Sequence, residues 1–188
     1  MTVELYVHPA SAARWADVAE VIGNCAVANR CWCAFWYLSN TDYKNGWGEE
    51  NRLPLETRVA AGEEPGIVGY VDGEPAAWVS VAPRTAFDRL NRSKNFAPLD
   101  DVPVWAVNCF VVARRFRRRG LMPLLARAAA DFALAKGAPG VEAYPIEPSA
   151  KSGAGDLFVG IVEAFKTAGY VEVARPLPRR PIMRLMAG

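Results

Sequence analysis

The sequence has little histidine and little cysteine. Its one histidine, His8, excludes any site that needs two histidines and gives no support to Ser–His or Cys–His nucleophile chemistry. The four cysteines are Cys25, Cys31, Cys33 and Cys109. No Cys-x-x-Cys pair occurs, and Cys31-x-Cys33 is poor spacing for zinc. We therefore expect free, reduced and mostly buried thiols, and no metal site.

Long apolar runs and an excess of one charge are also missing. The most apolar stretch, Val102–Ala113, has 12 residues, whereas a bilayer-spanning helix needs roughly 20. The first residues show no basic segment leading into an apolar one, so we expect a cytoplasmic protein that binds no membrane. A formal charge of +2 is too small to imply a polyanion partner for the whole surface, so any basic feature must be local.

The length and the periodicity of the chain predict one compact domain over residues 1–188. The clearest hairpin joins Gly66–Val71 to Glu74–Ala82 through Asp72-Gly73, a pair that favours a type I′ turn. The clearest helix is Gly120–Lys136, which carries a regular apolar stripe and ends before Gly137.

Weaker patterns predict the other elements. We expect further strands at 4–7, 104–112, 140–146, 170–175 and 181–186, further helices at 11–23, 54–62 and 156–168, and loops at 40–51 and 83–102. The strand, helix and strand over 104–146 form one right-handed crossover with a parallel pair, whereas the preceding hairpin makes the rest of the sheet largely antiparallel. These elements indicate an α/β (α+β) fold with a mixed central sheet.

The segment Val111–Met122 carries the strongest chemical signal. A buried strand runs into a turn with five arginines, which opens directly onto the helix. Helix N-termini have unpaired N–H groups and about half a positive charge. Gly120 lets the backbone approach a ligand closely, and flanking arginines complete a pyrophosphate site. The alternative interpretation of this segment is a solvated basic turn.

This segment resembles the acyl-CoA-binding motif of the GCN5-related N-acetyltransferase (GNAT) superfamily, Arg/Gln-x-x-Gly-x-Gly/Ala. Arg117 matches the first position and Gly120 the central glycine, whereas Met122 stands where the family has Gly or Ala. Three further stretches resemble family elements in the right order: VGYVDGEPAAWVSV the second and third strands, EAFKTAGYVEVAR the fourth helix and next strand, and PIMRLM the closing strand.

The resemblance implies a three-layer fold, in which a mixed sheet of six or seven strands lies between helices and the parallel fourth and fifth strands splay apart. It implies an acetyltransferase that moves acetyl from acetyl-CoA to a primary amine of a small molecule or peptide. The amine would attack directly, with no covalent enzyme intermediate. Coenzyme A is the one cofactor implied, no metal is needed, and a monomer or homodimer is expected.

The resemblance also implies where the cofactor binds. The pantetheine would pair with the backbone of Cys109, Phe110, Val111 and Val112. The diphosphate would lie on the amides of Arg117, Arg118, Arg119, Gly120, Leu121 and Met122. A backbone N–H of the fourth strand, at Phe110 or Val111, would stabilise the thioester oxyanion.

Two glutamates are the predicted general bases. The amine must lose a proton to attack, so a base, acting directly or through water, is expected. Glu142 lies in the fifth strand and Glu147 follows at its mouth. The alternative interpretation is that Glu142 and Glu147 are ordinary solvent-facing glutamates without a catalytic role. Asp100 and Asp101 in the long connection are further candidates.

Aromatic residues indicate an acceptor site. Trp32 and Trp36 lie where relatives place their acceptor-binding helices, and Tyr144 shares one face of the fifth strand with Glu142 because side chains alternate. We expect the two tryptophans and the 84–101 connection to border a cleft for an apolar or aromatic amine. Packing in the core is the alternative for the aromatic residues.

Two other functions compete with catalysis. Many relatives use a tyrosine of the fourth helix to protonate the leaving thiolate, and this sequence has Phe165 there. Phe165 and Met122 favour a catalytically impaired CoA-binding GNAT-fold protein that serves as a sensor or interaction domain. Nucleic-acid binding through Arg114–Arg119 is the third hypothesis, and the small net charge counts against it. We expect no nucleic-acid partner.

Overall fold

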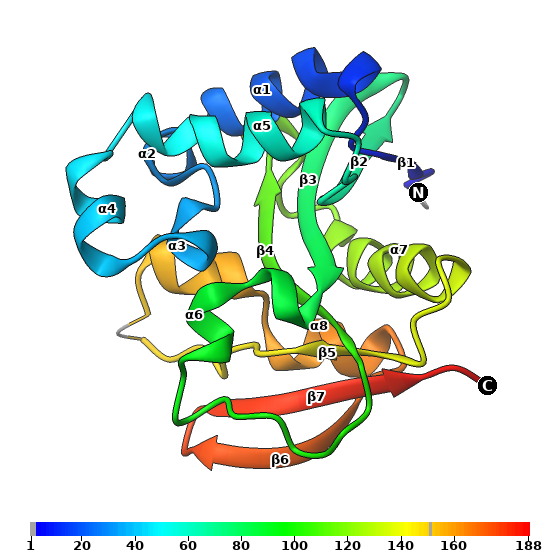
Figure 1. Cartoon of the computed structure of the whole chain (residues 1–188). Helices are drawn as coiled ribbons and strands as arrows, with labels where there is room; N and C mark the ends of the chain where they lie inside the picture. Colours follow the sequence, from blue (N-terminus) through cyan, green and yellow to red (C-terminus); the bar gives the residue numbers. More distant parts are fainter. Residues whose placement is uncertain (1–2, 151) are drawn as a thin grey trace.

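A seven-stranded sheet runs through the computed structural model, which describes residues 3–150 and 152–188 (Figure 1). Its strands lie in the order β1-β2-β3-β4-β5-β7-β6. They are β1 (Tyr6–Pro9), β2 (Gly66–Val71), β3 (Glu74–Pro83), β4 (Trp105–Val112), β5 (Gly140–Ala143), β6 (Val171–Leu177) and β7 (Arg180–Met186). Only β4 and β5 pair in parallel, and every other pairing within the sheet is antiparallel. The predicted mixed sheet with one parallel pair is confirmed.

Helices cover both faces of this sheet (Figure 1). The helices are α1 (Trp15–Gly23), α2 (Ala28–Cys31), α3 (Ala34–Tyr37), α4 (Asn40–Asn45), α5 (Leu53–Ala60), α6 (Asp88–Asn91), α7 (Leu121–Ala135) and α8 (Val162–Thr167). One buried cluster joins the sheet to α7 and α8, and a second joins the opposite face to the N-terminal helices. No helix in residues 3–150 and 152–188 is long and apolar enough to cross a membrane.

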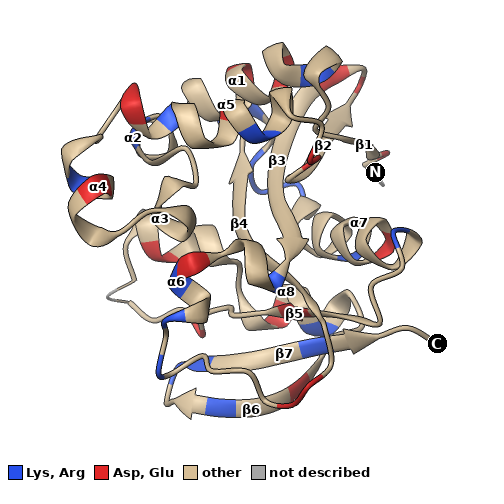
Figure 2. Ribbon diagram, viewed as in Figure 1, with Lys and Arg blue, Asp and Glu red and all other residues tan. Residues whose placement is uncertain are grey.

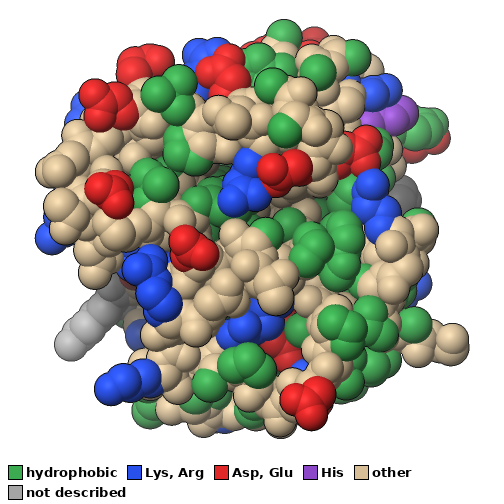
Figure 3. Space-filling view, in the orientation of Figure 1, with side chains coloured by type: hydrophobic (Ala, Val, Ile, Leu, Met, Phe, Trp, Pro, Cys, Tyr) green, Lys and Arg blue, Asp and Glu red, His purple; other side chains and the backbone are tan. Residues whose placement is uncertain are grey.

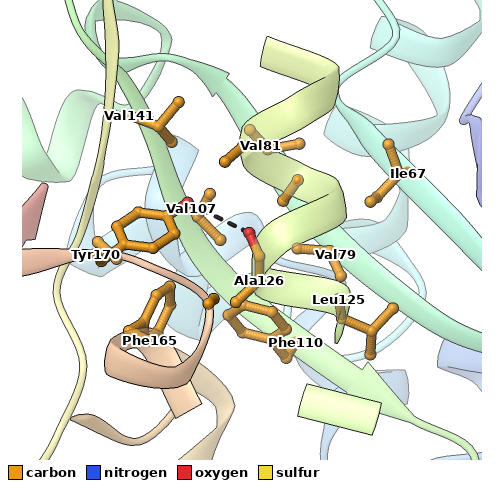
Figure 4. Close-up of a cluster of buried hydrophobic side chains, with 14 of the residues drawn as sticks. Ile67, Val79, Val81, Val107, Phe110, Leu125, Ala126, Val141, Phe165 and Tyr170 are labelled. Carbon is orange, nitrogen blue, oxygen red and sulfur yellow. Dashed lines mark hydrogen bonds between the residues drawn. The ribbon is translucent and has the colours of Figure 1, made fainter. Parts of the chain in front are cut away.

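Local residue chemistry explains the most regular elements. Asp72 and Gly73 have φ values of 53° and 79°, which confirms the type I′ turn between β2 and β3. On the sheet face covered by α7 and α8, Phe110 and Phe165 meet edge to face with ring centroids 5.7 Å apart (Figure 4). Tyr170 donates a hydrogen bond to the Ala126 carbonyl at 3.3 Å. These contacts fix α7 and α8 on the sheet.

Several predicted segments differ from the structure. The loop expected over 83–102 contains the short helix α6. The helix expected over 156–168 is wrong as a single element, because a 3₁₀ helix η5 (Ala154–Val159) and α8 are separated at Gly160. Gly160 has a φ of 81°, and a Cβ there would lie 2.6 Å from the Phe165 ring, so the segment bends to pack against β4. The loop expected over 40–51 contains α4, whose first turn is capped by Ser39 Oγ. The strand expected over 140–146 ends at Ala143.

Charged residues of both signs are interspersed along the ribbon (Figure 2). On the face shown in Figure 3, basic side chains are separated by acidic and uncharged ones. This face therefore offers no continuous basic surface to a polyanion, in agreement with the small net charge.

A buried polar network joins β5, β7 and the connection before β4. Arg184 of β7 reaches Glu142 Oε1 with Nη2 at 2.6 Å and Asp100 Oδ2 with Nη1 at 2.6 Å. Tyr144 donates its hydroxyl to the second oxygen of Glu142 at 2.7 Å. Glu142 is 2% exposed and Arg184 9% exposed. Because both Glu142 oxygens have partners, the desolvated charge is compensated.

We predict that Arg184→Met destabilises the fold by about 3 kcal/mol, because it leaves the buried carboxylate of Glu142 without a cation. Urea denaturation followed by fluorescence measures this loss. Arg175→Met is the matched control, since Arg175 forms its ion pairs with Glu147 and Glu172 at the surface. The control should unfold close to the wild-type midpoint. Equal midpoints for the wild-type protein and Arg184→Met would contradict a stabilising network.

Candidate active site

The parallel strands β4 and β5 separate after a short paired stretch. Their pairing ends with Val107 opposite Ala143. On its other side, β4 stays paired with β3 as far as Val112. The edge of β4 from residue 108 to residue 112 therefore faces a gap in the sheet, as the predicted splay requires.

Backbone groups of β4 point into this gap. Ala113 donates its N–H to the Ala76 carbonyl of β3 at 2.9 Å. Because antiparallel neighbours alternate between hydrogen-bonded and non-hydrogen-bonded pairs, the N–H groups of Val112 and Phe110 point away from β3. The Val112 carbonyl on that side accepts a hydrogen bond from Arg117 Nε at 2.8 Å. The N–H of Phe110 is thus directed to the side from which β5 has diverged.

A β-bulge in β4 turns two consecutive side chains to one face. Cys109 pairs with Ser80 and Val107 pairs with Val81, so Asn108 is an extra residue between the two pairs. Asn108 and Cys109 both line a cavity on the face covered by the N-terminal helices. The sequence analysis did not select Asn108. The available signal was one polar side chain inside an otherwise apolar strand.

The cavity has a volume of about 290 Å³. It is lined by Ile22, Val27, Ala28, Cys31, Cys33, Phe35, Trp36, Tyr43, Asn108, Cys109, Val111, Gly155, Asp156, Phe158, Val159 and Arg180. These residues come from α1 to α4, β4, η5 and the start of β7, or from the turns beside them. Asp156 is the one acidic lining residue and Arg180 the one basic lining residue within the described parts of the chain.

The arginine turn leads from β4 to the first turn of α7. Arg118 and Gly120 have φ values of 63° and 73°, and the helix begins at Leu121. A Cβ added to Gly120 would meet no atom within 4 Å, so the backbone there is open to a ligand. Arg117 is held by its contacts to the Val112 carbonyl and to Cys25 Sγ at 3.4 Å, whereas Arg118 and Arg119 are exposed. Leu121 is buried and Met122 half-buried.

The two predicted bases lie outside the cavity lining. Glu142 is held in the buried network with Arg184 and Tyr144. Glu147 is half-buried and pairs with Arg175 at 2.8 Å, which lowers the pKa of the Glu147 carboxyl and makes it a weaker base. Asp156 of η5 is the carboxylate that lines the cavity. The roles of Glu142 and Glu147 as bases, directly or through water, remain predictions.

The predicted acceptor residues are placed differently from one another. Trp36 lines the cavity, whereas Trp32 is buried beside it against Trp15, with ring centroids 6.1 Å apart. Tyr144 is 1% exposed and hydrogen-bonded to Glu142, outside the lining. The 84–101 connection contributes no lining residue. It supports the wall through Arg89, whose guanidinium lies 3.8 Å above the Phe35 ring.

Of the thiols that line the cavity, those of Cys33 and Cys109 are buried and that of Cys31 is half-buried. All four cysteines are free, and Cys31, Cys33 and Cys109 line the cavity. The hydrogen bond with Cys33 and burial together raise the pKa of the Cys109 thiol well above its ordinary value. The same hydrogen bond lowers the pKa of the Cys33 thiol. A neutral thiol is a poor nucleophile, so the raised pKa makes Cys109 poorly suited to form a covalent bond with an acyl group. Phe165 is fully buried against Phe110 and Tyr170 and offers no hydroxyl for proton transfer (Figure 4).

Solved structures with this fold include several acetyltransferases. A GNAT-family acetyltransferase from Listeria monocytogenes superposes with a TM-score of 0.58 at 10% identity, over 98% of this chain and 96% of that one. A PaiA N-acetyltransferase from Thermoplasma acidophilum in complex with coenzyme A gives 0.53 at 10% identity, over 98% and 99%. The aminoglycoside acetyltransferase AAC(6′)-Ib with coenzyme A and kanamycin gives 0.53 at 13% identity, over 97% and 95%. At such low sequence identity, these superpositions show a shared fold and nothing more.

Sequence comparison establishes the family. No curated protein sequence matches the chain significantly. The family model described as "Acetyltransferase (GNAT) family" matches residues 32–152, which is more than half of the chain and includes β4, the arginine turn and α7. The chain belongs to the GNAT family of acetyltransferases.

Proposed function

We propose that this protein is an acetyl-CoA-dependent N-acetyltransferase that acts on a primary amine of a small molecule or peptide. One observation carries the proposal. β4 leaves β5 after Val107, and this exposes a row of backbone groups that runs from the cavity to the open N-terminus of α7. A long thioester needs such a path, with its reactive end in a cavity and its anionic end on helix amides.

The cofactor would lie along this path. Its pantetheine would pair with the backbone of residues 109–112 in the gap. Its diphosphate would rest on the amides of residues 117–122, where the macrodipole of α7 favours an anion. The arginines add charge to this end, although Arg117 is already tied to the strand through Val112. Coenzyme A bound to solved proteins of the same fold supports this placement.

The chemistry would be direct aminolysis of the thioester. The amine nitrogen forms a bond to the acyl carbon, the carbon–sulfur bond breaks, and the sulfur leaves as the CoA thiolate. The N–H of Phe110, directed into the gap, would stabilise the negative charge that develops on the acyl oxygen. Since Phe165 offers no acid, the thiolate would leave unprotonated and take its proton from water.

A carboxylate would accept the proton of the amine. Glu142 and Glu147 would have to act through water, because neither lines the cavity. We add Asp156, which does line it and whose Oδ2 accepts a hydrogen bond from the Gly153 N–H at 2.9 Å. The exposure of Asp156 gives it a route to return the proton to solvent.

A catalytically impaired CoA-binding protein is the second candidate. The apolar packing of Phe165, where many relatives have a tyrosine, is the observation that favours it. Release of free thiol from acetyl-CoA in the presence of amines separates the two candidates. A catalyst releases thiol in proportion to amine, whereas a sensor domain binds the cofactor without amine-dependent release.

We predict that Gly120→Glu abolishes measurable binding of CoA in calorimetry. The new side chain would project from the open backbone that faces the diphosphate and would add a negative charge there. Single Arg118→Ala and Arg119→Ala changes should have modest effects, because backbone amides provide most of the contacts.

Gly137→Glu is the matched control for this prediction. Gly137 follows the other end of α7, has a φ of 87°, and also offers open space to a Cβ. The control introduces the same side chain with the same backbone strain, and it should bind CoA like the wild type. Wild-type affinity in a folded Gly120→Glu protein would remove the proposed cofactor site.

We predict that Asp156→Asn lowers kcat by roughly 100-fold near neutral pH, as expected for the loss of a general base. The amide keeps the hydrogen bond from Gly153 but cannot accept a proton. The defect should shrink as the pH rises toward the pKa of the amine, because the amine then loses its proton to solvent. Glu147→Gln and Glu142→Gln, measured over the same pH range, test the other two carboxylates. A larger, pH-dependent loss in either of them would transfer the role from Asp156.

A further inference from the structure

The amide of Asn108 is an unpaired polar group on the cavity wall. Asn108 is 1% exposed, and neither its Nδ2 nor its Oδ1 has a hydrogen-bond partner among the described residues. It is the one cavity-lining residue in the described ranges with a buried nitrogen or oxygen that lacks a partner. The β4 bulge directs this side chain to the cavity face together with Cys109.

An orphan amide is costly in a folded protein. A buried polar group without a partner destabilises a protein, because its hydrogen bonds to water are lost and not replaced. Asn51 differs from Asn108, because its Nδ2 donates to the carbonyls of Arg30 and Tyr43 at 3.1 and 3.0 Å and only its Oδ1 lacks a partner. Asn51 therefore holds loops together, whereas Asn108 holds nothing within the described chain. A group of this kind at a cavity wall is positioned to bind a ligand.

The rest of the cavity restricts the ligand. Phe35 meets Trp36 and Tyr43 edge to face, with ring centroids 5.1 and 5.6 Å apart. Ile22, Val27, Val111, Phe158 and Val159 complete an apolar wall. Arg180 already donates to the carbonyls of Tyr144 and Pro145 at 2.9 and 3.1 Å. Asp156 is the one carboxylate among the described lining residues that can pair with a cationic group of a ligand. A molecule with several ammonium groups would leave most of its charges unpaired against apolar walls.

We propose that the acceptor is a monoamine with an aromatic or aliphatic body, and that Asn108 positions its amine for attack on the thioester. The amide oxygen of Asn108 accepts one N–H of the neutral amine. The nitrogen lone pair stays free to attack the acyl carbon, and the apolar body packs against Phe35 and Trp36. This inference rests on the proposed acetyltransferase function and names its acceptor class.

The experiment compares Asn108→Leu and Asn108→Ala with the wild type. Thiol release from acetyl-CoA is measured with phenethylamine, hexylamine, spermidine and kanamycin, CoA affinity by calorimetry, and stability by urea denaturation. Phenethylamine and hexylamine should react at least tenfold better in kcat/KM than the two polyamines. Both variants should lose roughly tenfold in kcat/KM for the monoamines, the effect of one hydrogen bond. Their CoA affinity should not change.

Stability distinguishes binding from a structural role. Asn108→Leu removes an unpaired polar group, so its unfolding midpoint should equal or exceed that of the wild type. Asn51→Leu, which breaks two buried hydrogen bonds, is the matched control and should unfold at lower urea concentration.

Each contrary outcome identifies what fails. Monoamine turnover that both Asn108 variants leave unchanged would overturn the role of Asn108. A preference for spermidine or kanamycin would overturn the acceptor class. CoA binding without thiol release to any amine would overturn the proposed transferase function, and this inference with it.

Discussion

The separation of β4 from β5 is the constraint on which the site depends. Up to Val107 the two strands pair in parallel, and beyond it the next element that β4 meets on that side is η5. The separation leaves backbone groups of β4 facing a gap instead of β5, and this gap is where we propose that the cofactor binds. A sheet paired along its whole length would offer neither the Phe110 N–H nor room for a pantetheine chain. The network of Glu142, Arg184 and Asp100 holds β5 on β7, and so fixes the far side of the gap.

The bulge in β4 changes the faces to which the side chains of this strand point. In a regular strand, Asn108 and Cys109 would face opposite sides of the sheet. The extra residue opposite Ser80 and Val81 brings both to the cavity and leaves Phe110 on the α7 side, where it packs on Phe165. One strand thereby directs a backbone N–H into the gap, an amide into the cavity and an aromatic ring into the core.

The sheet, the hairpin and the α7 region could be predicted from the sequence because local signals determine them. Asp72-Gly73 gives the turn its positive φ angles, and a regular apolar stripe defines α7. The cavity could not be predicted in the same way. The bulge at Asn108 depends on register with β3, the break at Gly160 depends on the Phe165 ring, and α2 to α4 are too short to be stable without tertiary contacts. Trp36 was identified by its aromatic neighbourhood, but nothing local distinguished it from Trp32, which packs on Trp15.

Two buried polar residues on neighbouring strands differ in whether their side chains have partners. Glu142 on β5 has a cation and a hydroxyl as partners, so its burial is compensated and its removal would affect the fold. Asn108 on β4 has no side-chain partner in residues 3–150 and 152–188, so its burial is uncompensated within the described chain. From sequence alone, a glutamate is readily predicted to take part in acid–base chemistry, whereas a lone asparagine in a strand gives no such prediction. Open bonds alone do not identify a binding residue, because buried atoms of Trp15 and Asn51 also lack partners. Among the described residues, Asn108 is distinguished because its unpaired amide lines the cavity.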